Sequence, residues 1–313
     1  MPMAIDLETT IVAHRGHERV VLVSHDEDAP AEVPLVVDDP STFEPKWARY
    51  VAGVVAELHP TTGLIGEVAT TIPIGTGLSS SAALEVAVAL ALVGDDRVDR
   101  RHLALACQRA EHRASGVPCG IMDQLTSLLG VAGHALLMDC TTLDVSPVPV
   151  PDSTAVVVVD SGERRELAGS GYARRRAEVE RATELVGPLA AASLDAVAAI
   201  EDPTIRKRAR HVVSEIARVH EFVAALRAGD AVTAGELMTA SHASLRDDHE
   251  VSTPALDSLV ARLTATRGVY GARLTGGGWG GCVVALTEPG ALDGLQAASW
   301  TVRPSAGAIV EPV

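Results

Sequence analysis

The sequence predicts an α+β protein with two domains. Its 313 residues are enough for two domains and a large buried core. Short segments that alternate like strands share the chain with longer segments of helical periodicity. Three prolines stand among the five residues 147–151, which suits an extended connector better than a core element. We therefore expect one domain over residues 1–152 and another over residues 153–313, meeting at a cleft.

The first predicted domain begins with strands and continues mainly with helices. The expected strands are Thr9–His14, Arg19–Ser24, Leu64–Ile72 and Ala135–Asp139. The expected helices are Trp47–Leu58, Ser79–Val93 and Arg100–Ala114. Apolar residues at spacings of three and one mark the first of these helices, and Pro60 ends it.

The second predicted domain is mostly helical between two groups of strands. A short apolar run over Ala155–Asp160 predicts a buried strand, and helical patterns then continue to about Thr266. The strands Tyr270–Thr275 and Gly281–Leu286 flank a cluster of glycines. A last short strand is expected near Thr301.

The composition limits the possible partners and the compartment. The chain has 26 Lys and Arg against 41 Asp and Glu, a formal charge of −15, which argues against nucleic acid or an anionic membrane as the main partner. The basic clusters Arg174–Arg176 and Arg206–Arg210 are expected on solvated helix faces. No membrane span or targeting peptide is visible, and the four cysteines form no Cys-x-x-Cys pair. We therefore expect reduced cysteines and a cytoplasmic location. We also expect a monomer.

A glycine- and serine-rich segment, Pro73–Ala83, lies between a predicted strand and a predicted helix. Glycines let backbone N–H groups turn toward one point, and the helix N-terminus adds positive charge, so a polyphosphate is stabilised there. The hydroxyls of Ser79–Ser81 can bind phosphate oxygens or a cation. The segment lacks the Gly-Lys-[Ser/Thr] ending of a Walker A loop. An N-cap followed by tight helix–sheet packing explains the same residues, so both interpretations stay open on this motif alone.

Two acidic residues near a second turn are candidates for catalysis. Glu111 lies on a predicted helix, and Asp123 follows the Gly116–Gly120 turn near the start of another helix. A carboxylate and a serine hydroxyl suit Mg²⁺, which takes a few protein oxygens together with phosphate oxygens. Asp123 could accept a proton from a substrate hydroxyl during phosphoryl transfer. Alternatively, Asp123 only caps its helix and Glu111 lies on the surface.

A third segment, Leu274–Cys282, has five glycines among the six residues 276–281 between two predicted strands. Glycines at such density permit close approach of the backbone to a ligand or to another strand. A flexible hairpin is the alternative. Trp279 within the segment favours a packed loop.

These three segments, in this order, resemble the GHMP small-molecule kinases, and their details resemble the galactokinases among them. The motifs Gly120–Gln124 and Ser244–Asp248 are more specific to galactokinases than the glycine segments, which the wider family shares. The resemblance covers nearly the whole chain. It includes Pro2–Asp6, Cys107–Asp139, Arg164–Tyr172 and Arg303–Ala308.

The resemblance implies a fold and a reaction. The fold would have an N-terminal domain like ribosomal protein S5 domain 2 and a ferredoxin-like C-terminal domain, with the site between them. The reaction would be phosphorylation of galactose at its anomeric hydroxyl by Mg·ATP, giving galactose 1-phosphate and ADP. The implied partners are therefore a small sugar and ATP, with no nucleic acid and no membrane.

The resemblance also implies a role for individual residues. Asp123 would be the catalytic base and would contact the sugar, which Gly120 and Tyr172 would also touch. Ser81 and Glu111 would bind Mg²⁺. The residues implied in ATP binding are Ser24, Trp47, Gly75, Thr76, Gly77, Leu78, Ser79, Ser80 and Ser81.

One departure from the family pattern concerns the start of the sequence. Galactokinases carry a segment of the type Gly-Arg-Val-Asn-Leu-Ile-Gly-Glu-His-Thr-Asp-Tyr, and none precedes Pro2–Asp6 here. In the family this segment supplies an arginine beside the catalytic aspartate and groups that bind the sugar hydroxyls. We therefore expect this chain to bind ATP but to phosphorylate galactose weakly or not at all. A GHMP kinase for another sugar and a non-catalytic ATP- and sugar-binding regulator stay open as alternatives.

Overall fold

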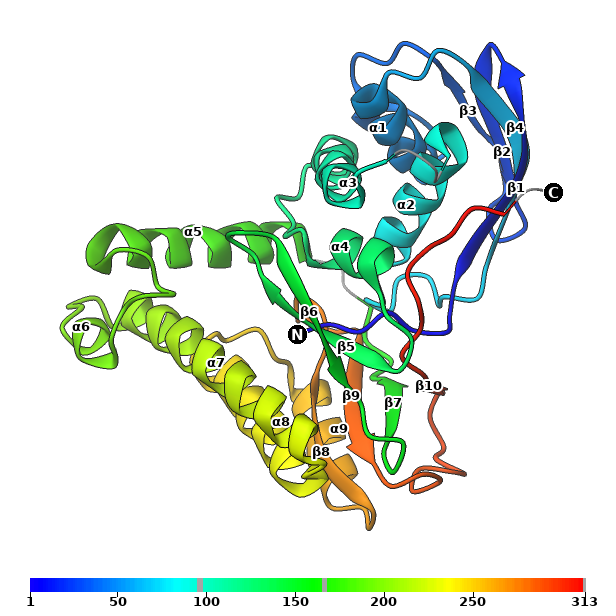
Figure 1. Cartoon of the computed structure of the whole chain (residues 1–313). Coiled ribbons are helices and arrows are strands. Elements are labelled where there is room, and N and C mark those ends of the chain that lie inside the picture. The colour runs from blue at the N-terminus through cyan, green and yellow to red at the C-terminus, as the bar shows by residue number, and fades with distance from the viewer. Residues whose placement is uncertain (95–97, 165–167, 312–313) are drawn as a thin grey trace. The chain divides into compact units, whose positions relative to one another are not determined.

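The computed structural model describes residues 1–94, 98–164 and 168–311, and within them it confirms a mixed α+β protein (Figure 1). Arg165, Glu166 and Leu167, in the stretch Arg164–Tyr172, lie outside the described residues. The chain forms two compact units. The first contains residues 1–74, 79–147 and 304–313, and the second contains residues 75–78 and 148–303. None of the described helices is long and apolar enough to cross a membrane.

A four-stranded sheet forms one side of the first unit. Its strands are β1 (Thr9–His17), β2 (Arg19–Ser24), β3 (Ala31–Pro34) and β4 (Gly63–Thr70), in the order β1-β4-β2-β3. β4 runs antiparallel to β1 and parallel to β2. Alternate residues such as Val20, Leu22 and Leu64 are fully buried, so the period of two in the sequence places one face of the sheet on the core. The sequence analysis did not predict β3.

Helices of the first unit share a core with the buried face of this sheet. They are the 3₁₀ turn η1 (Pro40–Thr42) and the helices α1 (Ala48–Leu58), α2 (Ser80–Val93), α3 (Arg100–Ser115) and α4 (Met122–Leu129). Asp99 caps α3 by accepting hydrogen bonds from the backbone N–H groups of Arg101 and His102, and Gly116 ends the helix at a φ of 71°. Gly53 lets α1 approach α3, because a Cβ there would lie 2.6 Å from the backbone oxygen of Ala110.

The proline-rich stretch expected as a connector is in part a strand. β5 (His134–Asp139) pairs with β6 (Asp144–Pro149) in a two-stranded sheet, and Val148 of β6 is fully buried. Prolines are tolerated in a strand that has a partner on one side only, because the missing N–H groups can face away from that partner. The tail also belongs to the first unit, since the backbone N–H of Ser305 donates to the oxygen of Ala4.

The second unit has an antiparallel sheet with strand order β10-β7-β9-β8. The strands are β7 (Ala155–Asp160), β8 (Val269–Leu274), β9 (Cys282–Thr287) and β10 (Ser299–Val302), as the sequence predicts within a few residues. Its helices are α5 (Ala168–Val186), α6 (Leu194–Ala198), α7 (Pro203–Ala228), α8 (Ala231–Asp247) and α9 (Pro254–Thr264). α9 packs on the sheet, with Leu256, Leu263 and Leu274 in the shared core.

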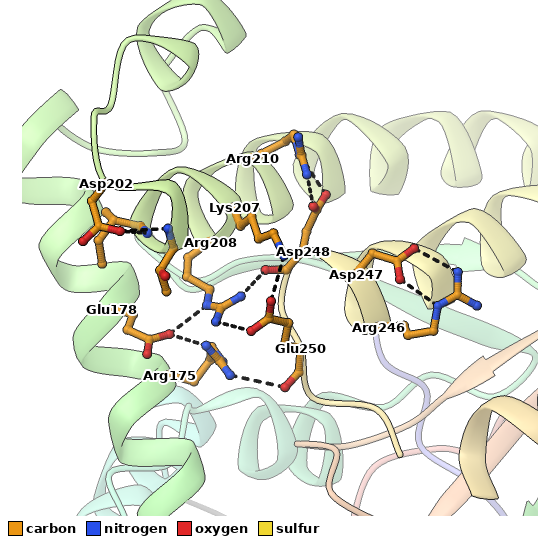
Figure 2. A network of polar contacts seen from close by, with 12 residues as sticks. Arg175, Glu178, Asp202, Lys207, Arg208, Arg210, Arg246, Asp247, Asp248 and Glu250 are labelled. Atoms are coloured by element: carbon orange, nitrogen blue, oxygen red, sulfur yellow. Dashed lines mark hydrogen bonds and ion pairs between the residues drawn. The ribbon is translucent and has the colours of Figure 1, made fainter. Parts of the chain in front are cut away.

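The sequence analysis expected the basic clusters of this unit on solvated helix faces, but two of their arginines are buried. Arg175 of α5 is 5% exposed and Arg208 of α7 is 2% exposed. Both donate to Glu178, and Arg208 also donates to Glu250 at 2.7 Å (Figure 2). Buried guanidinium groups need such partners, and here Glu178 of α5 and Glu250 of the loop between α8 and α9 supply them. Two other arginines of these clusters, Arg176 and Arg210, form ion pairs with Glu180 and Asp248.

Candidate active site

The start of α2 directs two serine hydroxyls at two different carboxylates. Ser79 occupies the N-cap position with a φ of 60°, yet its side chain makes no capping hydrogen bond. Its Oγ donates instead to Oδ2 of Asp123 at 2.7 Å. Ser79 is therefore the N-cap residue by position but not through its side chain, because a capping serine would accept a hydrogen bond from the first turn of the helix.

Asp123 lies in the first turn of α4 without acting as its cap. The N-cap residue is Ile121, which offers no side-chain hydrogen bond. The carboxylate of Asp123 is partly exposed and is oriented by the hydroxyl of Ser79. The N-terminal end of a helix stabilises a negative charge at this position, which suits a carboxylate that accepts a proton.

The second pair joins α2 and α3. Ser81 Oγ donates to Oε1 of Glu111 at 2.9 Å, while the other carboxylate oxygen accepts from Gln124 Nε2 at 2.6 Å and from the thiol of Cys119 at 3.2 Å. Glu111 is only partly exposed and makes three polar contacts, so it is not a free surface residue. A hydroxyl and a carboxylate oxygen side by side are hard ligands that fit Mg²⁺.

The sequence analysis assigned no role to Glu85 and Gln124. Gln124 donates hydrogen bonds to both Glu85 and Glu111. Both side chains are fully buried, and Gln124 Nε2 donates to Oε2 of Glu85 at 3.2 Å. Burial raises the pKa of Glu85 well above its ordinary value, and the negative charge of Glu111 raises it further. The signal was present in the sequence, because Glu85 is the one charged residue among the fourteen of α2.

Cys119 borders the site as a neutral thiol. Burial raises its pKa above the ordinary range, and the adjacent carboxylate of Glu111 acts in the same direction. The sequence analysis gave this cysteine no catalytic role, and its environment offers no activation as a thiolate nucleophile. Its S–H group donates a hydrogen bond to Glu111.

The other residues implied in nucleotide binding are the rest of the Gly75–Ser81 segment, described here, and Ser24 and Trp47, described below. Gly75 and Gly77 have positive φ values of 76° and 85°, which glycine adopts without strain. These two residues, with Thr76 and Leu78, are grouped with the second unit, whereas Ser79, Ser80 and Ser81 belong to the first.

Ser24 is the last residue of β2, and Trp47 is the N-cap residue of α1. Ser24 Oγ accepts from the backbone N–H of Asp26, and the indole of Trp47 donates to the oxygen of Ala29 at 3.0 Å. Trp47 is only 7% exposed and belongs to the core of the first unit. Among the described residues, no hydrogen bond joins either residue to the cluster around Asp123 and Glu111.

Besides Asp123, two residues are implied in sugar binding, and they lie in different units. Gly120 is exposed in the first unit, and a Cβ built on it would meet nothing within 4 Å. Tyr172 lies on α5 in the second unit, where its ring is 3.5 Å from the position of a Cβ on Gly277.

The glycine cluster beside Tyr172 is a packed loop and not a flexible hairpin. The backbone N–H of Trp279 donates to Val251 at 2.8 Å, and that of Gly281 donates to Glu163 at 3.0 Å. At Gly278 a Cβ would lie 2.3 Å from the oxygen of Val251, so only glycine allows this approach.

Comparisons with known proteins agree on one family. The model of the GHMP kinase N-terminal domain matches residues 49–131, and that of the GHMP kinase C-terminal domain matches residues 222–298. The chain is 44% identical to the galactokinase of Bos taurus over 93% of this chain and 79% of that protein. It is 44% identical to the galactokinase of Roseiflexus sp. over 92% of this chain and 77% of that protein.

Solved structures resemble the chain in the same way. The crystal structure of Lactococcus lactis galactokinase complexed with galactose has a TM-score of 0.88 and 31% identity, over 97% of this chain and 87% of that one. A mevalonate kinase, at 22% identity and a TM-score of 0.64 over 96% of this chain and 90% of that one, shares the fold. The fold is thus the two-domain α+β fold of the GHMP kinases. Both the sequence identity over most of its length and the structural likeness show that the chain belongs to the galactokinase family of the GHMP kinases.

Proposed function

We propose that the protein transfers the γ-phosphoryl group of ATP to the anomeric hydroxyl of galactose, with Asp123 as catalytic base and Mg²⁺ on Ser81 and Glu111. The observation that carries this proposal is the pair of contacts at the start of α2, from Ser79 to Asp123 and from Ser81 to Glu111. One helix end thereby brings a proton acceptor and a hard-cation site to a place where phosphates bind favourably. Galactokinases at 44% identity support galactose as the acceptor.

The nucleotide would bind through backbone N–H groups of the Gly75–Ser81 segment and of the first turn of α2. Because Ser79 does not cap the helix with its side chain, its hydroxyl does not compete with a phosphate for those donors. A magnesium ion bound by Ser81 Oγ and Glu111 would supply positive charge against the β- and γ-phosphates. Ser24 and Trp47 are proposed at the nucleotide base.

Asp123 would remove the proton from the attacking hydroxyl. The anomeric oxygen of galactose forms a bond to the γ-phosphorus, the bond from phosphorus to the bridging oxygen breaks, and ADP leaves with that electron pair. The proton passes to the carboxylate of Asp123, which Ser79 keeps in place by donating to Oδ2. Gly120 and Tyr172 are proposed to contact the sugar, and open space beside Gly120 suits a ligand that passes close to the backbone.

The test is to identify the product formed by the protein as its gene encodes it. Purified protein is mixed with Mg·ATP and galactose, glucose, mevalonate or homoserine, while ADP release and ³¹P NMR spectra are recorded. From a protein that carries the family segment before Pro2–Asp6 we expect ADP release that depends on galactose and a phosphate signal of galactose 1-phosphate. From residues 1–313 alone we expect ATP binding with weak turnover or none. Turnover of another compound alone would replace galactose as the substrate. ATP and galactose binding without turnover of any compound would favour the regulator. The monomeric state and the cytoplasmic location stay predictions.

A further inference from the structure

The buried acid Glu85 is linked through Gln124 to Glu111 of the proposed magnesium site, and it takes no part in the chemistry described above. Glu85 of α2 is fully buried, and its Oε2 accepts from Nε2 of Gln124 at 3.2 Å. The same nitrogen donates to Oε2 of Glu111 at 2.6 Å. The helices α2, α3 and α4 pack against one another in the first unit (Figure 1). They supply Glu85, Glu111 and Gln124, whose side chains form one chain of contacts.

Stability of the fold does not account for this arrangement. Glu85 Oε1 and Gln124 Oε1 are buried with no hydrogen-bond partner among the described residues. Buried polar atoms in that state cost free energy, and an apolar side chain of similar length would fill the same space without this cost. Val86, Ala89 and Leu125 of the same two helices belong to the core of the first unit. The negative charges of Glu111 and Asp123 also act on Glu85, so the burial of this acid is unfavourable.

The geometry gives Gln124 a specific effect on Glu111. An amide nitrogen has two N–H groups, and here one can serve each carboxylate. Oε2 of Glu111 is held by Gln124 and by the thiol of Cys119, so its other oxygen, Oε1, lies toward Ser81. The amide of Gln124 can hold Oε2 in this way only while its own plane is fixed, and Glu85 provides the second contact that fixes it.

We propose that Glu85 is a positioning residue that acts through Gln124 to keep Oε1 of Glu111 facing Ser81 Oγ. This inference rests on the proposed function, because it assumes that Ser81 and Glu111 bind the magnesium ion of Mg·ATP. The loss of a group that holds a metal ligand in place by hydrogen bonds commonly lowers the metal affinity by about 10–100-fold. Glu85 contacts neither ATP nor sugar in this proposal and is not a catalytic residue.

The test compares two substitutions of nearly equal size. Glu85→Gln keeps an acceptor oxygen for Gln124, whereas Glu85→Met removes it. Calorimetry measures the affinity for ATP with Mg²⁺ and for ADP without metal, and Mn²⁺ binding is followed by electron paramagnetic resonance. We expect Glu85→Met to weaken Mg·ATP and Mn²⁺ binding about 10–100-fold. We expect Glu85→Gln to remain within about threefold of wild type, and both variants to keep wild-type affinity for metal-free ADP.

Two controls make the result decisive. Thermal unfolding should show Glu85→Met close to wild type in stability, because the removal of a buried acid offsets the loss of its contact with Gln124. If it nevertheless fails to fold, Gln124→Met takes its place and should show the same loss of metal affinity. Since both residues act through one chain of contacts, the double variant should bind metal no more weakly than Gln124→Met alone.

The outcomes separate this inference from the proposed function. Unchanged metal affinity in Glu85→Met, or an equal loss in Glu85→Gln, would overturn the positioning role. A parallel loss of metal-free ADP binding would also overturn it, because a general distortion would then explain the effect. The proposed metal site is tested apart from Glu85 by Ser81→Ala with Glu111→Gln. If that double variant keeps wild-type metal affinity, the proposed function itself is wrong at this point.

Discussion

Two serine hydroxyls at the start of α2 contact two different carboxylates, to which we assign different parts of the proposed chemistry. The hydroxyl of Ser79 donates to Asp123, and that of Ser81, two residues further along, donates to Glu111. A residue two positions away on a helix points in a different direction, so one short segment reaches two carboxylates that come from different helices. The proton acceptor and the cation site can therefore be tested separately.

The first prediction concerns the cation site. Ser81→Ala combined with Glu111→Gln should weaken binding of Mg·ATP much more than binding of ADP without metal. Both proposed ligand oxygens are lost or neutralised, whereas the backbone donors to phosphate remain. Calorimetry with and without Mg²⁺ measures the two affinities. Equal losses under both conditions would show that the pair does not hold the metal.

At the scale of elements, substitution by alanine should lower the stability at one glycine of the first unit and leave it unchanged at another. A Cβ on Gly53 would lie 2.6 Å from the oxygen of Ala110 in α3, where backbone cannot give way, while a Cβ on Gly120 would meet nothing within 4 Å. Gly53→Ala should destabilise the fold by about 2 kcal/mol, because overpacking outweighs the gain in helix propensity.

Gly120→Ala serves as the matched control for stability and as a probe of the sugar. It should leave the unfolding temperature unchanged and raise KM for galactose, since the new methyl group would occupy space proposed for the ligand. Thermal unfolding and steady-state kinetics measure the two effects. A stable Gly53→Ala protein, or a Gly120→Ala enzyme with unchanged KM, would contradict the respective assignment.

Most elements were predictable because their signals are local. Helix α2 follows a glycine–serine turn and is almost wholly apolar, and β7 is a run of valines, so burial and period agree with sequence. β6 was missed because Pro147 and Pro149 argue against a strand unless its neighbours are known. β3 is four residues long and carries too short a pattern.

The candidate site was predictable only where a residue type carries its own chemistry. Asp123, Glu111 and the serines stood out as acids and hydroxyls beside turns. Gln124 and Glu85 depend on helices that meet in space, and Arg175 and Arg208 were misread because sequence spacing does not show which face another helix covers. Burial of a polar group becomes visible only when its neighbours are known.

At the scale of the whole molecule, the buried His211 and the half-buried His249 should make stability depend on pH. The rings of His211 and His249 stack with centroids 4.2 Å apart, and Nδ1 of His211 lies 2.9 Å from Ser244 Oγ. Burial lowers the pKa of His211 to about 3 and that of His249 to about 4. Positive groups around them act in the same direction, namely Arg175, Arg208, Arg218 and Arg273.

The sign of the effect follows from proton uptake. An unfolded histidine binds a proton near pH 6.5, whereas these two stay neutral in the fold until the pH approaches about 4 and about 3. The unfolded state therefore binds more protons below pH 6.5, and stability should fall as pH drops from 6.5 toward 4. The loss is at most about 1.4 kcal/mol per pH unit for each histidine.

Denaturant unfolding between pH 7.5 and pH 4.5 measures this dependence. His249→Gln should reduce the slope of unfolding free energy against pH, because one of the two titrating groups is removed. His14→Gln changes an exposed histidine of the first unit and should leave the slope as it is. Equal slopes for wild type and His249→Gln would remove His249 from the explanation.

The rate of galactose 1-phosphate formation by Asp123→Asn, compared with wild type at saturating Mg·ATP, tests the proposed mechanism most directly. The substitution keeps the shape of the side chain and removes the proton acceptor, so the rate should fall about 10²–10⁴-fold. ATP affinity should change little, and Asp152→Asn, at an exposed position, should keep the wild-type rate. An Asp123→Asn enzyme that forms product at the wild-type rate would contradict the role of Asp123 as catalytic base.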